Sequence, residues 1–185
     1  MSICGMSAPR QQPTRDTCSR GCSELSSQEL TAMSSLVEAA KRKLKLKSTL
    51  VFVGTVWAIH LLNIVLSLPM IDFPLDAFGL RPRTLAGLPG IVTMPLLHAS
   101  LGHLIGNTIP LLVLLVLLAG SRERSWDIVT GIILLGGGLL WLVGRDHVHV
   151  GASGLISGLV AFLVLRGVFE KRLAAVLVAV VTFLL

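Results

Sequence analysis

Hydrophobic residues gather along the chain in long runs, which short polar or charged segments separate. Runs of helical length lie at about residues 49–68, 99–119, 126–143 and 152–165. About 20 residues, rising about 1.5 Å each, cross the hydrocarbon core of a bilayer, which is about 30 Å thick. A fifth hydrophobic run begins at Leu173 and is too short to cross by Leu185. The pattern predicts an all-α membrane protein, a polytopic helix bundle with about four complete spans and a truncated fifth.

The composition agrees with this pattern. Of the 185 residues, 53% are hydrophobic and 14% are charged, whereas an ordinary soluble domain carries roughly 25% charged residues. These values exclude the soluble globular classes. The net charge is +6, but eight of the 16 Lys and Arg precede residue 48, in a segment without aromatic residues. We therefore expect no nucleic-acid partner, because a nucleic-acid surface combines clustered basic residues with stacking aromatics.

The first 47 residues form a polar segment before the first span. Residues 1–32 are rich in Ser, Arg, Gln and Pro and have no period that could bury a core, so we expect disorder. Met33 is an alternative start and begins a short basic amphipathic run. The three cysteines also lie in this segment: Cys4, Cys18 and Cys22. They fit neither a disulfide framework nor a zinc site, and we expect free thiols. The predicted domains are a disordered segment over 1–47 and a transmembrane domain over 48–185.

Lys and Arg are unevenly distributed over the connections between the spans. Five of them lie between residues 41 and 47, so the positive-inside rule predicts a cytoplasmic N-terminus. With alternating spans, about ten Lys and Arg fall inside and three outside. The connection from Pro69 to Pro95 then lies outside and is unusually long for a loop. We expect an integral, multi-pass protein of the cell (inner) membrane, surrounded by the lipid bilayer. Nothing in the sequence indicates its oligomeric state.

Two groups of polar residues interrupt the predicted spans. His98, His103 and Asn107 lie at the outer half of the second span, and the last two are four residues apart on one helix face. Gly151-Ala152-Ser153-Gly154 begins the fourth span. A serine at a loop-to-helix junction exposes its hydroxyl beside backbone N–H groups that can bind an oxyanion. Polar side chains within a membrane are functional candidates, and the predicted topology puts both groups at the same depth.

Other interpretations of these residues explain less. A soluble serine hydrolase has a G-x-S-x-G motif, but residue 155 is Leu and the chain has no α/β alternation. A metal site is a second alternative, since imidazole binds zinc or copper. Its ligands would be His98, His103, His147 and His149. Such a site would leave the Gly-Ala-Ser-Gly turn unexplained, so we expect no metal and no cofactor. His60 in the first span has no visible partner, and we interpret it as structural.

These motifs resemble those of the rhomboid intramembrane serine proteases. The likeness covers about residues 48–185. It depends on a His-x4-His-x3-Asn pattern at 98–107, the Gly-Ala-Ser-Gly turn at 151–154 and a Gly-Leu-Arg-Pro-Arg loop at 79–83. In this order and on successive spans the motifs are specific. The resemblance implies a rhomboid-like bundle that cleaves transmembrane protein substrates near the outer membrane face. The connection from Pro69 to Pro95 would lie half in the membrane beside this bundle.

The resemblance also implies a role for each matching residue. Ser153 would be the catalytic nucleophile, and His103 and Asn107 would donate hydrogen bonds to the oxyanion. Three further residues would support the site: His98, Gly151 and Gly154. The histidine would hold the outer loop through hydrogen bonds, and the glycines would allow loop and helix to approach closely.

One departure from the family pattern matters. Rhomboid proteases complete a Ser–His dyad with a histidine followed closely by glycine on a sixth span, and this sequence contains no such span. A serine without a base is a poor nucleophile at neutral pH. His149, four residues before Ser153, is a conceivable substitute. We expect a fragment that is inactive by itself and whose base lies on a later span. The alternative is a catalytically inactive relative that binds transmembrane segments.

Overall fold

The regular elements of the protein are α-helices and short 3-10 helices. The structure, a computed structural model, describes residues 15–121, 124–171 and 173–184. The elements are α1 (Arg15–Leu66), η1 (Leu75–Phe78), η2 (Leu85–Gly87), α2 (Gly90–Thr93), η3 (Met94–Leu96), α3 (Leu101–Ser121), α4 (Ser125–Val143), α5 (Ser153–Phe169) and α6 (Leu173–Leu184). The chain divides into two compact units, residues 1–41 and residues 42–185. The second unit contains the candidate site and is described from here on.

Helix α1 begins earlier than the sequence predicted. We expected disorder over residues 1–47, but α1 is helical from Arg15 onward. Its stretch from Met33 to Lys47 consists largely of Leu, Ala, Glu and Lys, which favour the helix. A Glu38–Lys41 ion pair of 2.9 Å adds a contact one turn apart. Cys4 and the thiols of Cys18 and Cys22 lie outside what the structure describes, so their predicted state is not tested.

The predicted spans are confirmed as helices. Three helical segments are long and apolar enough to cross a membrane: Thr31–Leu66, Leu101–Gly120 and Ser125–Val143. Helix α5 has 17 residues and ends at Phe169, four residues beyond the predicted end of the fourth span. Helix α6 begins at Leu173, as predicted, and has 12 residues. The all-helical membrane fold is therefore correct.

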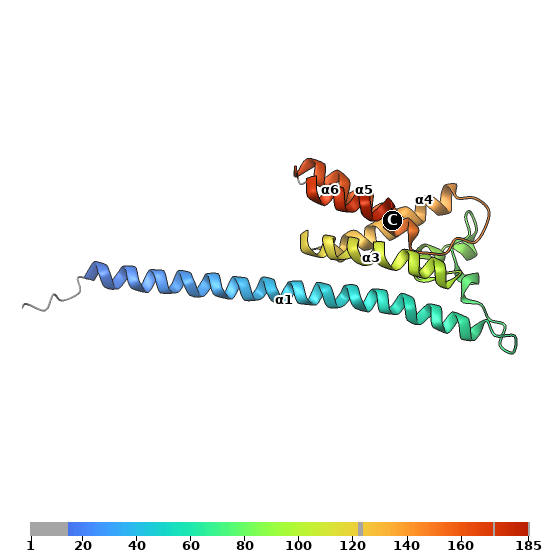
Figure 1. Cartoon of the computed structure of the whole chain (residues 1–185), viewed down its shortest axis with the longest axis horizontal. Helices are drawn as coiled ribbons and strands as arrows, with labels where there is room; N and C mark the ends of the chain where they lie inside the picture. The colour runs from blue at the N-terminus through green and yellow to red at the C-terminus, as the bar shows by residue number, and fades with distance from the viewer. Residues whose placement is uncertain (1–14, 122–123, 172, 185) are drawn as a thin grey trace, which may run out of the picture. The chain divides into compact units, whose positions relative to one another are not determined.

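Helix α5 lies at the centre of this bundle. It packs against α3, α4 and α6, and Figure 1 shows it close to all three. The buried core consists of Leu111, Leu114, Leu115 and Leu118 of α3, Val129 of α4, and Ala152, Leu155, Ile156, Leu159 and Leu163 at the start and along α5. These positions recur every three or four residues, which brings them to one face of each helix. Glycine at 158 lets α5 approach Ile132 of α4 closely.

The long connection between α1 and α3 folds against α4. Gly137 of α4 faces Ile91, where an added Cβ would lie 2.8 Å from the isoleucine side chain. The Arg83 N–H donates to the Trp141 carbonyl at 2.9 Å, and the Trp141 indole N–H donates to the Thr84 carbonyl at 2.9 Å. The connection is thus a structured element fixed to the bundle and not a free loop.

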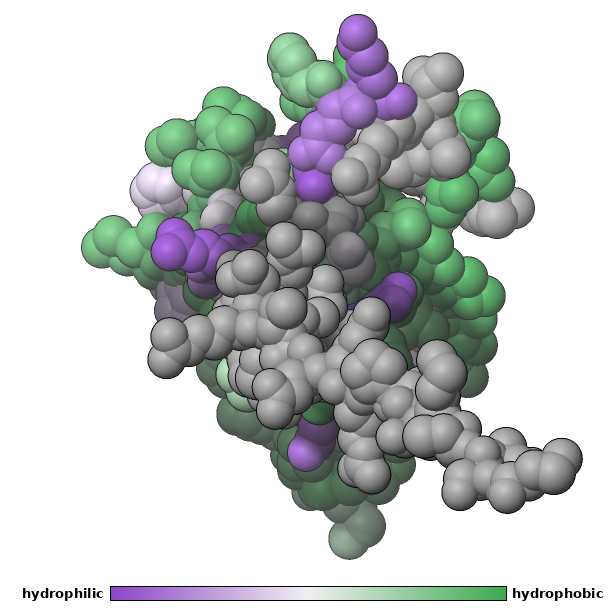
Figure 2. Space-filling view, turned by 90° about the vertical axis from the view of Figure 1, so that its left-hand side faces the viewer, coloured by the Kyte–Doolittle hydropathy of each residue, from purple (hydrophilic) through white to green (hydrophobic). Residues whose placement is uncertain are grey.

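The outer surface of the bundle is apolar. Large side chains are exposed on the outward faces of the helices, including Leu135 at 72% and Val143 at 80%. Figure 2 shows hydrophobic residues over most of the coloured surface, with hydrophilic residues in small groups. A soluble monomer rarely exposes so much contiguous apolar surface, whereas lipid tails cover it well.

Candidate active site

The two polar motifs predicted from the sequence meet at Gly151. A Cβ added at this glycine would lie 2.5 Å from Cε1 and 2.7 Å from Nε2 of His103, and 3.6 Å from the amide nitrogen of Asn107. The Gly151 φ angle is +114°, which glycine adopts readily and other residues rarely do. Its N–H donates to the Met94 carbonyl at 2.9 Å. The turn before α5 is therefore seated directly on the polar face of α3.

Ser153 is the first residue of α5 and its side chain is exposed. In the described part of the chain, no group forms a hydrogen bond with its Oγ atom. Ala152 before it is fully buried and has no side chain that could cap the helix. The N–H groups in the first turn of a helix have no carbonyl partner within that helix. A free hydroxyl therefore lies beside free backbone donors.

Asn107 is buried, with 8% of its surface exposed, and its amide nitrogen has no hydrogen-bond partner among the described residues. His103 is half-buried, and its ring also makes no hydrogen bond within the described ranges. Its backbone N–H donates to the Ser100 hydroxyl at 3.2 Å. Ser100 thereby caps the N-terminus of α3. A buried donor without a partner is rare in a folded protein and suggests a ligand or a reacting atom as its partner.

His98 lies under this site in a way that the sequence did not predict. Its side chain is 1% exposed and packs edge-on against His103, with the ring centroids 5.2 Å apart. The resemblance implied that His98 holds the outer loop through hydrogen bonds, but neither of its ring nitrogens makes one within the described chain. The backbone carbonyl of His98 accepts a hydrogen bond from His60 Nδ1 at 3.0 Å instead. The His98 side chain is therefore held by burial and by its edge contact with the His103 ring.

The environment of His98 predicts an acid-sensitive fold. Burial, together with repulsion from His103 and His60, lowers the pKa of His98 from 6.5 to about 4, and the nearby Leu96 backbone only partly opposes this change. The unfolded chain binds this proton near pH 6.5 and the folded chain only near pH 4, so the free energy of unfolding falls as the pH drops between these values. We expect a lower thermal midpoint at pH 4.5 than at pH 7. His98→Gln should flatten that profile, and an unchanged slope in this variant would contradict the assignment.

Two buried polar residues of α1 hold the connection between α1 and α3, through contacts that the sequence did not predict. His60 is 3% exposed, and because a carbonyl only accepts, its Nδ1 carries the hydrogen donated to His98. Asn63, one turn on, accepts the Leu75 N–H through Oδ1 at 2.7 Å and so holds η1. The available signal was the presence of His and Asn within an otherwise apolar span. We interpreted His60 as structural, and its bond to the chain before α3 gives that role a definite partner.

The loop before Ser153 is held by the long connection. Leu80 and His149 form an antiparallel bridge, with N–H to carbonyl distances of 3.0 and 2.8 Å. Gly79 lies so close to this loop that an added Cβ would be 2.7 Å from the His149 carbonyl oxygen. Arg83 Nη1 donates to the Gly144 carbonyl at 2.7 Å. The loop at residues 79–83 therefore fixes both ends of the segment that leads to Gly151.

The other two histidines contact each other and the loop before the serine. The rings of His147 and His149 stack with their centroids 3.9 Å apart, and His149 Nε2 contacts the Arg145 carbonyl at 3.0 Å. No hydrogen bond joins either ring to Ser153 in the described structure. The described residues contain no group of three or more His, Cys, Asp or Glu side chains that could hold a metal ion. The predicted alternatives of His149 as base and of a four-histidine metal site thus gain no geometric support.

Comparison with known proteins identifies one protein family. The family model of the rhomboid domain matches residues 86–185. Uncharacterized proteins of Mycobacterium tuberculosis and Mycobacterium bovis are 47% identical to the chain over 107 residues, which is 53% of this chain and 44% of theirs. An uncharacterized protein of Mycobacterium leprae is 43% identical over 107 residues, 53% of this chain and 42% of its own length. The chain thus spans less than half the length of these relatives. No solved structure matches significantly. Because the rhomboid model matches 100 of the 185 residues, the chain is an integral, multi-pass membrane protein that belongs to the rhomboid family.

Proposed function

We propose that the chain carries the nucleophile and the oxyanion donors of an intramembrane serine endopeptidase. One observation supports this above the others: Gly151, two residues before Ser153, lies directly against His103 and Asn107, whose amide nitrogen is buried without a partner among the described residues. A structural asparagine at this depth would be expected to have its donors satisfied. A donor kept free beside a free hydroxyl fits a site that binds a charge during reaction.

Each residue has a distinct part in the proposed reaction. Ser153 Oγ attacks a peptide carbonyl carbon, forming a C–O bond, while its proton passes to a base. The carbonyl π electrons move to the oxygen, which then accepts hydrogen bonds from Asn107, from His103 and from the Ser153 backbone N–H. Collapse of this intermediate expels the amine, which takes the proton, and water hydrolyses the acyl-serine. Removing one oxyanion donor typically lowers the rate by about 10²–10³.

The general base is assigned to a histidine outside these 185 residues. No described histidine ring forms a hydrogen bond with Ser153 Oγ, and the mycobacterial relatives are more than twice as long as the matched segment, which is 44% of their length. A serine needs such a base at neutral pH. The substrates proposed are transmembrane proteins cleaved near the outer membrane face, at the end of the bundle opposite the basic residues 41–47.

The test is covalent labelling of the product of the complete reading frame by a fluorophosphonate in native membranes. We expect labelling that Ser153→Ala abolishes, because only an activated serine reacts quickly with this reagent. Ser157→Ala is the matched control, since Ser157 is an exposed serine one turn later on α5, and it should label normally. Equal labelling of the protein and its Ser153→Ala variant would refute the proposal. Absent labelling, together with cross-linking to single-span segments, would favour the non-catalytic alternative.

A further inference from the structure

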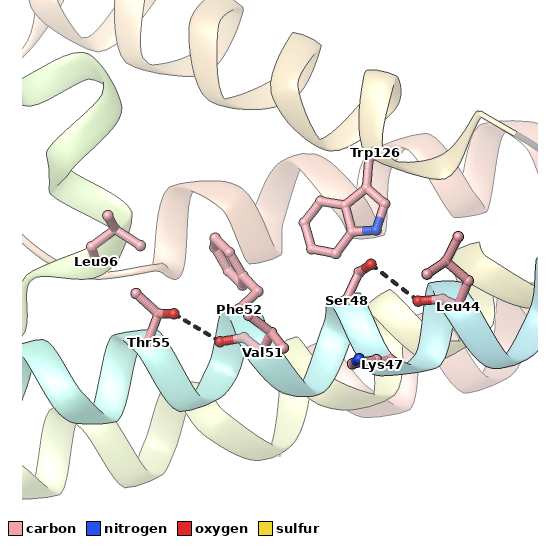
Figure 3. Close-up of a pocket in the computed structure, with 8 residues that line it drawn as sticks. All are labelled: Leu44, Lys47, Ser48, Val51, Phe52, Thr55, Leu96 and Trp126. Atoms are coloured by element: carbon pink, nitrogen blue, oxygen red, sulfur yellow. Dashed lines mark hydrogen bonds between the residues drawn. The ribbon is translucent and has the colours of Figure 1, made fainter.

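A groove lies between α1, α4 and the end of η3, away from the candidate active site. Its volume is about 550 Å³, and its lining consists of Leu44, Lys47, Ser48, Val51, Phe52, Thr55, Leu96 and Trp126. Figure 3 shows Trp126 reaching from α4 toward α1, with Phe52 beside it. The centroids of these two rings are 5.6 Å apart. Cavities of about 300–1,000 Å³ are typical of sites for small molecules.

The hydroxyl groups in the wall of the groove are already hydrogen-bonded, so the wall offers a ligand mainly apolar surface. The Ser48 hydroxyl donates to the Leu44 carbonyl at 3.0 Å, and the Thr55 hydroxyl donates to the Val51 carbonyl at 2.8 Å. Both hydroxyl protons are therefore used within α1, as the dashed lines in Figure 3 indicate. Apart from Lys47, the remaining surface comes from Leu, Val, Phe and the Trp126 ring system. Such a wall suits a hydrocarbon chain better than a polar ligand.

One end of the groove, in contrast, offers two free donors. Lys47 is exposed and makes no ion pair in the described part of the chain. The indole N–H groups of Trp57 and Trp141 are bonded, to the Thr108 hydroxyl at 3.1 Å and to the Thr84 carbonyl at 2.9 Å. The Trp126 N–H has no partner among the described residues. In Figure 3 this nitrogen lies on the side of the ring nearer Leu44, and Lys47 comes from the same stretch of α1, on the other side of its ribbon in this view.

This polar end belongs to the membrane face opposite Ser153. Lys45, two residues before Lys47, donates to the Ala119 carbonyl near the C-terminal end of α3, whereas His60 contacts the chain before the N-terminal end of α3. Arg42 and Lys43 are exposed just before it and add positive charge. Clustered cations at a membrane interface attract anionic lipid head groups, and a tryptophan prefers the same depth.

We propose that this groove binds one acyl chain of an anionic phospholipid, whose phosphate accepts hydrogen bonds from the Lys47 ammonium and the Trp126 indole N–H. An additional α-helix is the competing occupant. The free donors favour a phosphate over a helix, whose polar groups are already bonded internally.

The test follows Trp126 fluorescence in mixed bilayers. The full chain with Trp57→Phe and Trp141→Phe leaves Trp126 as the sole indole, and phospholipids with brominated chains quench it on contact. We expect brominated phosphatidylglycerol to displace unlabelled phosphatidylcholine with about fivefold selectivity, since one interfacial lysine contributes about 1 kcal/mol. Lys47→Gln should remove this selectivity. Lys171→Gln, which deletes one exposed cation at the same membrane face but outside the groove, should retain it.

A second measurement keeps the native tryptophans. In detergent, added phosphatidylglycerol should raise the thermal unfolding midpoint more than phosphatidylcholine does, and Lys47→Gln should lose that difference. Ser48→Phe, which fills the groove, should lower quenching by both lipids. Equal quenching by the two lipids, or equal losses in Lys47→Gln and Lys171→Gln, would overturn the head-group contact. Unquenched fluorescence in every lipid would mean that protein covers the groove and would overturn the proposal as a whole.

Discussion

Asn107→Ala is expected to lower the cleavage rate by about 10²–10³ without lowering the stability of the protein. The rate falls because the variant removes one proposed oxyanion donor. The stability holds because the Asn107 amide nitrogen has no hydrogen-bond partner among the described residues, so no native bond to that nitrogen is lost. Relieving a buried donor without a partner can even stabilise a fold, by about 1–3 kcal/mol. The measurements are turnover of a single-span substrate by the product of the complete reading frame and its thermal midpoint in detergent.

Asn63→Ala is the matched control for this variant. Asn63 is also buried, at 7% exposure, but its Oδ1 accepts the Leu75 N–H at 2.7 Å. Its removal leaves that N–H without a partner, so we expect a loss of about 1–3 kcal/mol in the free energy of unfolding. The rate per folded molecule should change little. If Asn107→Ala destabilised the protein as much as Asn63→Ala and the rate fell only with the folded fraction, Asn107 would be a structural residue.

Much of the fold could be predicted because lipid imposes a simple rule on the sequence. A span must be a helix whose length matches the bilayer, so the hydrophobic runs alone located α3 and α4 to within two residues at each end. The start of α1 could not be predicted in this way. Outside the predicted first span, helix formation over Met33–Lys47 depends on local propensity, which is a weaker signal than hydrophobicity. Orientation in the membrane stays a prediction from the positive-inside rule.

The centre of the candidate site was predictable for a related reason. Polar residues in apolar helices stand out, which directed attention to His103, Asn107 and the turn that contains Gly151 and Ser153. The structure places Gly151 of this turn next to both side chains. The loop contacts that hold the site were not predictable. The bridge between Leu80 and His149 joins two irregular segments far apart in sequence, and neither segment carries a period that indicates its partner.

The glycines show the same limit at the level of single residues. The family resemblance implied the same close approach of loop and helix for Gly151 and Gly154. The structure separates them, because an added Cβ at Gly154 would meet only the end of the Met94 side chain, at 3.6 Å. The tight helix contact on α5 is at Gly158, against Ile132. Which glycine is indispensable depends on what lies opposite it, and sequence does not contain that information.

Gly151→Ala is therefore expected to damage both folding and catalysis. The φ angle of +114° costs a residue with a Cβ about 1–3 kcal/mol. The new methyl would also lie 2.5 Å from the His103 ring, which must turn aside. A displacement of about 1 Å in a catalytic group can lower a rate about 10²-fold. We expect a lower thermal midpoint and, in the molecules that remain folded, a loss of fluorophosphonate labelling and of turnover by about that factor.

Gly154→Ala provides the control, since it adds the same methyl three residues later on the same turn. Its nearest neighbour at 3.6 Å is at ordinary van der Waals distance, and Gly154 lies within α5, where alanine is a better helix former than glycine. The variant should keep its midpoint or raise it, and should label normally. If Gly151→Ala and Gly154→Ala behaved alike, the seating of the Ser153 turn on His103 would not be what positions the nucleophile. If only Gly151→Ala lost activity, the contact between α3 and the start of α5 would be established as the feature that assembles the site.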